Sequence, residues 1–276
     1  MKKKIIEVLK NCHENNKSLL AFNVQNIYHL QALKEVSDEL KIAVIVQFSA
    51  RYVKQFQKRF GFEFLIEKYR NNYMYYHLDH CQDLELIEFC IKIGFDGVMY
   101  DGSEHSICHN IDITRKVKDM AIPYNCIVEG ELGEIGGVED GEGGEQMSHA
   151  NLNEVKEYVD KTDVDVLALG IGNAHGFYTT LKNIDTSLLL KAKKILNNNQ
   201  FFVLHGGSGL PEEIVKETIN YGVVKINYST QIKETTNQAL KEYMKKDELF
   251  NEINFENTLI SRLKEVYIKL LNTYTI

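Results

Sequence analysis

The sequence is poor in the residues that several protein classes require. It has no tryptophan and two prolines, and its five cysteines (Cys12, Cys81, Cys90, Cys108 and Cys126) are an odd number without CxxC spacing. A disulfide framework or a structural zinc cluster is therefore not expected. No apolar run approaches the roughly 20 residues that cross a bilayer, and no Pro- or Ser-rich stretch divides the chain. The sequence predicts a single domain, residues 1–276.

Basic residues are also in the minority. The chain has 32 Lys and Arg against 39 Asp and Glu, which gives a net charge of -7. Because it has no basic block and no basic-aromatic stripe, neither nucleic acid nor a membrane is an expected partner. The start MKKKIIEVLK contains a basic run, but Glu7 and Lys10 interrupt the apolar residues that a signal peptide needs. We expect a cytoplasmic protein.

Eight short apolar runs alternate with segments of helical spacing. Each run is continuous rather than alternating, which is typical of parallel strands buried on both faces. Eight such alternations in roughly 230 residues predict an α/β fold, a (β/α)₈ TIM barrel, with a doubly wound open sheet as the alternative. The runs are residues 19–24, 42–48, 73–79, 95–100, 124–129, 165–170, 201–206 and 223–227.

Two further helical patterns, 230–246 and 256–273, follow the last predicted strand. One helix is needed to close a barrel, so the fold is expected to carry extra C-terminal helices. The second pattern has an apolar face that includes Leu263 and Leu271. This face is free to pack on a neighbouring subunit, and we expect a homodimer or homotetramer.

Polar residues gather where the predicted strands end. The carboxyl ends of barrel strands meet at one mouth, so His80, His175 and His205 should converge there. Three imidazoles with one open position are the ligand set of a catalytic zinc or a similar ion. Each residue alone has an ordinary structural interpretation, since Asp79 can cap a helix and Asp101 can form a turn. The convergence of several at one mouth favours a metal site.

Glycines beside these histidines predict a second binding function. Residues 206–209 read Gly-Gly-Ser-Gly and lead into a helix that begins near Pro211, so backbone N–H groups and the Ser208 hydroxyl can hold a phosphate. The stretches GNAHG (172–176) and NYST (227–230) end the neighbouring strands. Phosphate sites of TIM barrels commonly use the loops after strands seven and eight.

One long irregular stretch, residues 129–150, carries seven acidic residues and seven glycines. Loops of this length are usually either functional or disordered. Because it follows the fifth predicted strand, at the mouth, we expect it to be mobile and to order over bound substrate.

Residues 1–235 resemble the class II, metal-dependent ketose-bisphosphate aldolases, which include the fructose- and tagatose-bisphosphate enzymes. The matching motifs occur in the order of the family. They are AFNV (21–24), HLDHC (77–81), MYDGS (99–103), EGELGEIGGVED (129–140), GNAHGFY (172–178), FVLHGGSGL (202–210) and VVKIN (223–227).

The resemblance implies a zinc-dependent aldolase that forms dihydroxyacetone phosphate from a sugar phosphate. It places the zinc on His80, His175 and His205, with Asp101 and Glu131 at or near an alternative metal position. Zinc acting as a Lewis acid stabilises the enediolate, so no Schiff-base lysine is needed. Lys225, in the eighth predicted strand, is the residue that the alternative imine chemistry would use.

The resemblance also implies roles for acids, phosphate-binding residues and a second cation. Asp79 would be the acid/base for the hydroxyl that becomes the aldehyde, and Glu139 the base at the ketose carbon. A monovalent cation, Na⁺ or K⁺, would lie near the GNAHG and GGSG backbones. Expected substrate- and phosphate-binding residues are Asn23, Ser49, Arg51, Gly176, Gly206, Gly207, Ser208, Asn227, Ser229 and Thr230.

Two departures from the family leave the acceptor open. After strand eight, the pattern typical of the fructose enzymes is Asn-x-Asp-Thr-Asp and that of the tagatose enzymes is Asn-x-Ala-Thr-Glu. This chain has Asn-Tyr-Ser-Thr-Gln at 227–231. After the second predicted strand, QFSARY (47–52) keeps Ser49 but lacks the Gly-Gly pair of some fructose enzymes. Arg51 is either a contact for a second phosphate or a solvated residue. A metal-dependent sugar-phosphate isomerase or epimerase, and a non-catalytic sugar-phosphate-binding protein, remain alternatives on the same barrel.

Overall fold

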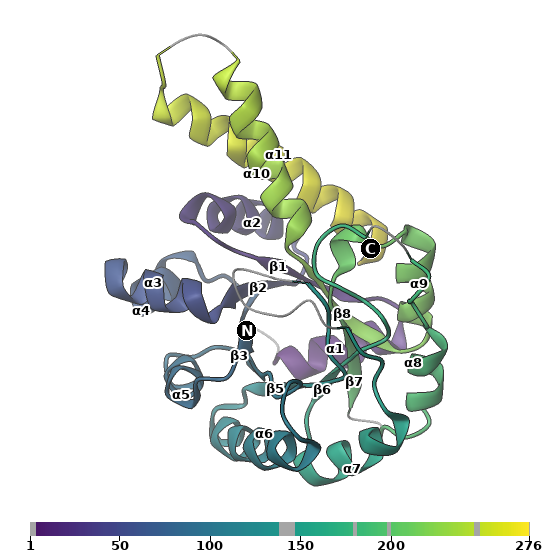
Figure 1. Cartoon of the computed structure of the whole chain (residues 1–276). Coiled ribbons are helices and arrows are strands. Elements are labelled where there is room, and N and C mark those ends of the chain that lie inside the picture. Colours follow the sequence, from purple (N-terminus) through teal and green to yellow (C-terminus); the bar gives the residue numbers. More distant parts are fainter. Residues whose placement is uncertain (1–3, 138–146, 179–180, 198–199, 246–248, 276) are drawn as a thin grey trace.

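Eight parallel strands close into a barrel in sequential order (Figure 1). The computed structural model describes residues 4–137, 147–178, 181–197, 200–245 and 249–275. Strand β8 pairs with β1, with Leu19 opposite Lys225, so the TIM barrel prediction is confirmed and the open-sheet alternative is wrong. The strands are β1 (Leu19–Asn23), β2 (Val44–Ser49), β3 (Met74–Cys81), β4 (Gly97–Tyr100), β5 (Ile127–Leu132), β6 (Val166–Leu169), β7 (Phe201–Leu204) and β8 (Val223–Tyr228).

Helices surround the barrel in the described parts of the chain, and none of those described is long and apolar enough to cross a membrane. They cover the outer faces of the strands, which explains why the strands are apolar on both sides. The helices are α1 (Ile5–Glu14), α2 (Ile27–Leu40), α3 (Ala50–Phe60), α4 (Phe62–Tyr69), α5 (Leu84–Lys92), α6 (Ile107–Ala121), α7 (Leu152–Thr162), α8 (Ser187–Ala192), α9 (Glu212–Asn220), α10 (Thr230–Met244) and α11 (Glu252–Tyr274).

Helix α1 packs against the end of the barrel opposite the mouth. Ile5, Leu9 and Cys12 lie on one face of α1 and belong to the same buried cluster as strand residues that point into the barrel. Glu7, which argued against a signal peptide, lies on the exposed face. The segment that the sequence analysis only excluded as a signal peptide is therefore an amphipathic helix.

The fifth strand is shifted relative to its prediction. Ile122–Tyr124 form a 3₁₀ turn and Asn125 adopts a left-handed conformation with φ 53°, so the strand begins at Ile127 rather than near residue 124. Glu129 and Glu131 consequently lie within β5, and the predicted irregular stretch 129–150 begins as strand. Proline and a left-handed residue end regular structure locally, although the apolar pattern continues through them.

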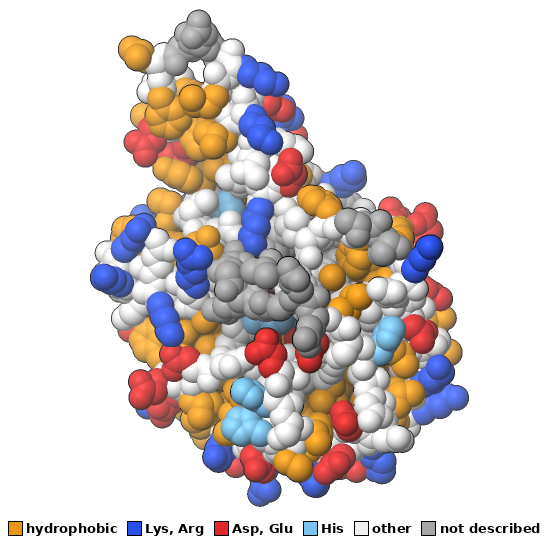
Figure 2. Space-filling model, viewed as in Figure 1, with side chains coloured by type: hydrophobic (Ala, Val, Ile, Leu, Met, Phe, Trp, Pro, Cys, Tyr) orange, Lys and Arg blue, Asp and Glu red, His pale blue; other side chains and the backbone are white. Residues whose placement is uncertain are grey.

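The two C-terminal helices form an arm that projects from the barrel (Figure 1). Both were predicted, at 230–246 and 256–273, and α11 begins four residues earlier than expected. Leu259, Leu263 and Leu271 on α11 are buried, and α11 packs along α2 and α10. Exposed apolar side chains gather on the arm (Figure 2). They are Leu240, Met244, Leu249, Phe250 and Ile253.

Candidate active site

A backbone irregularity brings Asp79 and His80 to the same mouth. Side chains of consecutive strand residues point to opposite faces, so a regular strand would turn one of them away. His80 has a left-handed φ of 37°, and the pairing of β3 with β4 shifts register between Leu78 and Cys81. This bulge redirects the imidazole inward, a common use of bulges beside functional sites.

The three predicted metal-ligating histidines meet at the mouth. His80, His175 and His205 each offer a ring nitrogen, and these atoms lie within 4.8 Å of one another. The ring centroids of His80 and His205 are 4.7 Å apart, and those of His80 and His175 are 5.1 Å apart. The structure therefore assembles these residues from β3 and from the loops after β6 and β7 into one potential ligand set.

Carboxylates fix the outward nitrogens of two of these rings. His80 Nδ1 lies 2.7 Å from Asp101 Oδ2, and His205 Nε2 lies 2.7 Å from Glu129 Oε1. Because ionised carboxylates only accept hydrogen bonds, both of these nitrogens must carry hydrogen. Such partners orient metal-ligating histidines in proteins.

The inward nitrogens then fit a cation. His80 Nε2 and His205 Nδ1 face each other at 2.9 Å, and with neutral rings each would direct a lone pair at the other. A proton or a metal ion between them removes this repulsion. The donor set, three imidazoles with carboxylates behind two of them, suits Zn²⁺.

A second group, His80, Asp101 and Glu131, could also hold a metal ion. Asp101 Oδ1 additionally accepts hydrogen bonds from the backbone N–H and the hydroxyl of Ser103, at 3.1 and 2.7 Å. Asp101 therefore forms a turn with Ser103 and also lies within reach of His80 and Glu131. Glu131 Oε2 lies 3.8 Å from His80 Nδ1, as expected for a residue at or near an alternative position.

The ionisable groups of this site strongly affect one another. Burial lowers the pKa of His80, but the charge of Asp79 and the hydrogen bond to Asp101 outweigh burial and hold the pKa well above its ordinary value. Burial would raise the pKa of Asp101, yet His80 lowers it. Burial and the neighbouring Asp101 charge raise the pKa of Glu131 well above its ordinary range. Opposed shifts of this kind are typical of functional sites.

Two amides hold the Asp79 carboxylate at the mouth. Asn23 Nδ2 donates to Asp79 Oδ2 at 3.2 Å, and Asn227 Nδ2 donates to Asp79 Oδ1 at 3.4 Å. Gln47 supports Asn23 through a 2.9 Å hydrogen bond. Asp79 lies within β3 and is 1% exposed, and its carboxylate accepts hydrogen bonds from these two side-chain amides. Asp83 instead caps α5, so the helix-cap interpretation of Asp79 is wrong.

The loop after β5 places His175. Gly136 pairs with Ala174 as an isolated parallel bridge, and the backbone N–H of His175 donates to Gly136 O at 2.7 Å. A Cβ at Gly137 would lie 2.6 Å from His175 O, and the φ of Gly137 is 87°. The paired glycines of the acidic loop thus allow two backbones to approach closely.

The glycines after β7 sit against the neighbouring loops. A Cβ at Gly206 would meet Ala174 O at 2.2 Å, and one at Gly207 would lie 3.0 Å from Asn227 O. Ser208 Oγ accepts a hydrogen bond from Gln231 N at 3.2 Å, which ties this turn to the start of α10. The predicted substrate- and phosphate-binding residues on the β6 to β8 side come from the loops after β6 and β7, the end of β8 and the start of α10. They are Gly176, Gly206, Gly207, Ser208, Asn227, Ser229 and Thr230.

Several buried polar atoms around the mouth have no hydrogen-bond partner among the described residues. Buried polar groups are nearly always paired in native proteins, so an unpaired group at a mouth points to a ligand. Three of these atoms belong to predicted substrate-binding residues. The atoms are Gln47 Oε1, Ser49 Oγ, Glu131 Oε2, Asn227 Oδ1 and Ser229 Oγ.

A cavity of about 360 Å³ adjoins His80 and Asp101 and extends to Lys54 and Asp83, which form a 2.7 Å salt bridge. Arg51 lies in the first turn of α3 and is exposed.

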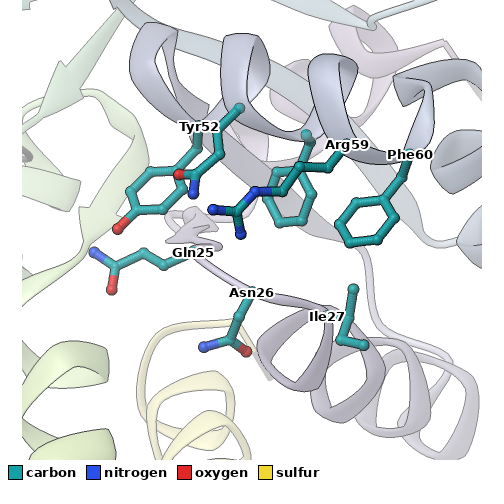
Figure 3. Close-up of a pocket in the computed structure, with 8 residues that line it drawn as sticks. Gln25, Asn26, Ile27, Tyr52, Arg59 and Phe60 are labelled. Carbon is teal, nitrogen blue, oxygen red and sulfur yellow. The ribbon is translucent and has the colours of Figure 1, made fainter.

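A separate cavity of about 170 Å³ lies between the start of α2 and α3. Gln25, Tyr52, Arg59 and Phe60 are among the residues that line it (Figure 3). This cavity is at the rim of the barrel rather than at the three histidines, so we do not assign it to the reacting atoms. Glu139, the predicted base at the ketose carbon, lies outside the described residues.

Sequence reasoning did not predict that Glu129, Lys225 and His77 contact one another inside the barrel. Glu129, Lys225 and His77 form a fully buried cluster below the histidines. Lys225 Nζ donates to Glu129 Oε2 at 2.7 Å, so the lysine named for imine chemistry is paired with a carboxylate inside the barrel. A charged residue inside a continuous apolar strand, as in VVKIN and CIVEGEL, was the available signal.

Comparison with known proteins identifies one matching family and several solved structures of similar fold. The family described as fructose-bisphosphate aldolase class-II matches residues 3–274. Among solved structures, the YdjI aldolase of Escherichia coli K12 has a TM-score of 0.84 and 22% identity, covering 100% of this chain and 98% of that one. Fructose-bisphosphate aldolase of Campylobacter jejuni has a TM-score of 0.82 and 18% identity, with 98% and 93% coverage. At these identities the structural matches show the fold.

Proposed function

The chain belongs to the class II fructose-bisphosphate aldolase family, and we propose that it is a zinc-dependent aldolase acting on a ketose phosphate or bisphosphate. It would cleave this substrate reversibly to dihydroxyacetone phosphate and an aldehyde. Members of the family are metal-dependent carbon–carbon lyases. The observation that carries the proposal is the pair of imidazole nitrogens of His80 and His205 that face each other beside His175.

Zinc bound by His80, His175 and His205 would polarise the ketone oxygen and stabilise the negative charge left when the carbon–carbon bond breaks. Asp79 would take the proton of the hydroxyl that becomes the aldehyde, and would return it in the synthetic direction. Its two amide donors, Asn23 and Asn227, hold the carboxylate in place for this transfer.

The β6 to β8 side would hold the dihydroxyacetone phosphate half. Backbone N–H groups at Gly206 to Ser208 and at the start of α10 would bind the phosphate, while the unpaired hydroxyl of Ser229 offers a further contact. The loops that include Gly176 and Gly206 would also hold a monovalent cation. Replacing Na⁺ and K⁺ by choline should then lower activity.

Glu139 would be the base at the ketose carbon, and its acidic loop would order over bound substrate. Glu139→Gln should slow proton exchange at that carbon and leave zinc content unchanged. If exchange continues at the original rate, the base is another residue.

We also propose a cytoplasmic homodimer or homotetramer of this single aldolase domain. The exposed apolar side chains of the arm, with Leu249 97% and Ile253 68% exposed, support burial against a second subunit. Sedimentation of the intact protein tests this. Leu249→Glu with Ile253→Glu should shift an oligomer toward monomer, whereas a monomeric unmodified protein would contradict the proposal.

The assay that tests the activity is coupled detection of dihydroxyacetone phosphate from a panel of ketose monophosphates and bisphosphates. A sugar-phosphate isomerase would share the metal and phosphate sites but would not need the clamped Asp79 at a breaking carbon–carbon bond. Isomerised sugar without triose would identify that activity. Binding without any turnover would indicate a sugar-phosphate-binding protein.

A further inference from the structure

A buried charged cluster lies directly below the candidate metal ligands. Glu129 Oε1 accepts from His205 Nε2 at 2.7 Å, and Glu129 Oε2 lies 2.7 Å from Lys225 Nζ and 3.1 Å from His77 Nε2. All four side chains are 0% exposed and come from four different strands or strand ends. Both oxygens of the Glu129 carboxylate therefore have partners inside the barrel.

Burying this charged cluster inside the barrel is energetically costly. Removing two charges from water costs several kcal/mol per ion, and apolar side chains of similar size are often at least as stable. The surrounding interior positions are apolar, among them Ile45, Tyr75 and Val203. Packing alone consequently does not account for a lysine and a glutamate here.

We infer that Glu129 and Lys225 are positioning residues that set the orientation and tautomer of His205 for the metal. Lys225 occupies Oε2 of Glu129, so Oε1 is left to accept the hydrogen of His205 Nε2. His205 must then present the lone pair of Nδ1 toward His80 Nε2, 2.9 Å away. The inference rests on the metal site of the proposed function.

A comparison with His80 supports the inference that residues inside the barrel orient His205. The partner of His80 is Asp101, whose side chain is 19% exposed at the mouth, whereas the partner of His205 is fully buried. His205 is therefore fixed from inside the barrel, by residues that cannot reach the substrate.

The test is metal binding by the full-length protein, measured with zinc or cobalt alone. Lys225→Met should raise the zinc dissociation constant about 10- to 100-fold, the usual effect of removing a residue that orients a metal ligand. The visible absorption of the cobalt-substituted protein should also change, because His205 is no longer held in one orientation. Competition with a chromophoric chelator measures the constant.

Two further variants separate positioning from stability. Glu129→Leu with Lys225→Met removes both charges, so the interior stays neutral and the fold should survive, while zinc affinity should still fall about 10- to 100-fold. Lys118→Met breaks the partly buried Lys118–Asp165 pair, which is 2.6 Å long and lies at the start of β6, and should leave zinc binding unchanged.

Unchanged zinc affinity and an unchanged cobalt spectrum in the folded double variant would overturn the inference and leave the aldolase proposal intact. Failure of the unmodified protein to bind zinc would overturn the proposed function and this inference together. Dihydroxyacetone phosphate production by the unmodified protein separates the two cases.

Discussion

The two sides of the barrel mouth are built from different parts of the chain. On the β6 to β8 side, backbone contacts among glycine loops define the surface, since a Cβ at Gly206 or Gly137 would meet a neighbouring carbonyl oxygen within 2.6 Å. On the β1 to β3 side, the side chains of Asn23, Ser49 and Asp79 define it.

This difference has a consequence for specificity. A surface made of backbone changes little when side chains change, and it suits a ligand part that is always the same. A surface made of side chains and bordered by an open cavity can change with few substitutions. We therefore expect the dihydroxyacetone phosphate half to be bound generically and the aldehyde half to be where substrate preference is set.

Removing the candidate metal ligand His205, which lies between the two sides, should have the largest effect. His205→Ala should reduce zinc affinity by more than about 100-fold, beyond the loss that follows removal of a supporting residue, and should abolish aldol cleavage. Metal analysis and the coupled triose assay measure both. His109→Ala, on the exposed surface of α6, serves as the matched variant and should retain zinc and activity.

Asp79→Asn tests the side built from side chains without disturbing the metal. General acid–base catalysis typically contributes about 10²- to 10⁴-fold, so kcat should fall by that factor. Zinc content should not change, because Asp79 contacts Asn23 and Asn227 in the structure. Asp112→Asn on the surface of α6 provides the comparison. Retention of full kcat would assign the proton transfer to another group.

The sequence predicts the order of strands and the histidines because strand ends of a TIM barrel share one mouth. Only the family resemblance placed both His80 and Asp79 at the mouth, because strand alternation alone does not: their common direction depends on a bulge and a left-handed φ. The buried Glu129–Lys225 pair was equally hidden, because residues 96 positions apart become neighbours only through barrel closure. Local sequence patterns specify where helices and strands form, whereas these contacts depend on how the strands are aligned with one another in the barrel.

Gly207→Ala tests the side built from backbone. The added Cβ would lie 2.7 Å from Ile226 Cγ2 and 3.0 Å from Asn227 O, so the turn after β7 must shift. We expect KM to rise about 10-fold for every ketose phosphate, since one charge-assisted hydrogen bond is worth roughly that factor. Gly222→Ala, at a φ of 108° and remote from the mouth, should lower the melting temperature and leave KM unchanged. A KM increase limited to one aldehyde half would show that this turn does not bind the common phosphate.

Arg51→Ala should have the smallest and most selective effect. Arg51 is exposed in the first turn of α3, so solvent weakens any contact it makes, and its loss should cost roughly 10-fold in binding of a phosphorylated acceptor. Unphosphorylated aldehydes should bind nearly as before. The measurement is kcat/KM for aldol synthesis with matched pairs of phosphorylated and unphosphorylated aldehydes.

Lys58→Ala, two turns further along the exposed surface of α3, removes the same charge farther from the mouth and should change neither kind of acceptor. Equal losses for both kinds after Arg51→Ala would remove Arg51 from the acceptor site. Efficient cleavage restricted to fructose 1,6-bisphosphate would instead show that Ser229 and Gln231, where this chain departs from the family pattern after β8, do not alter substrate preference.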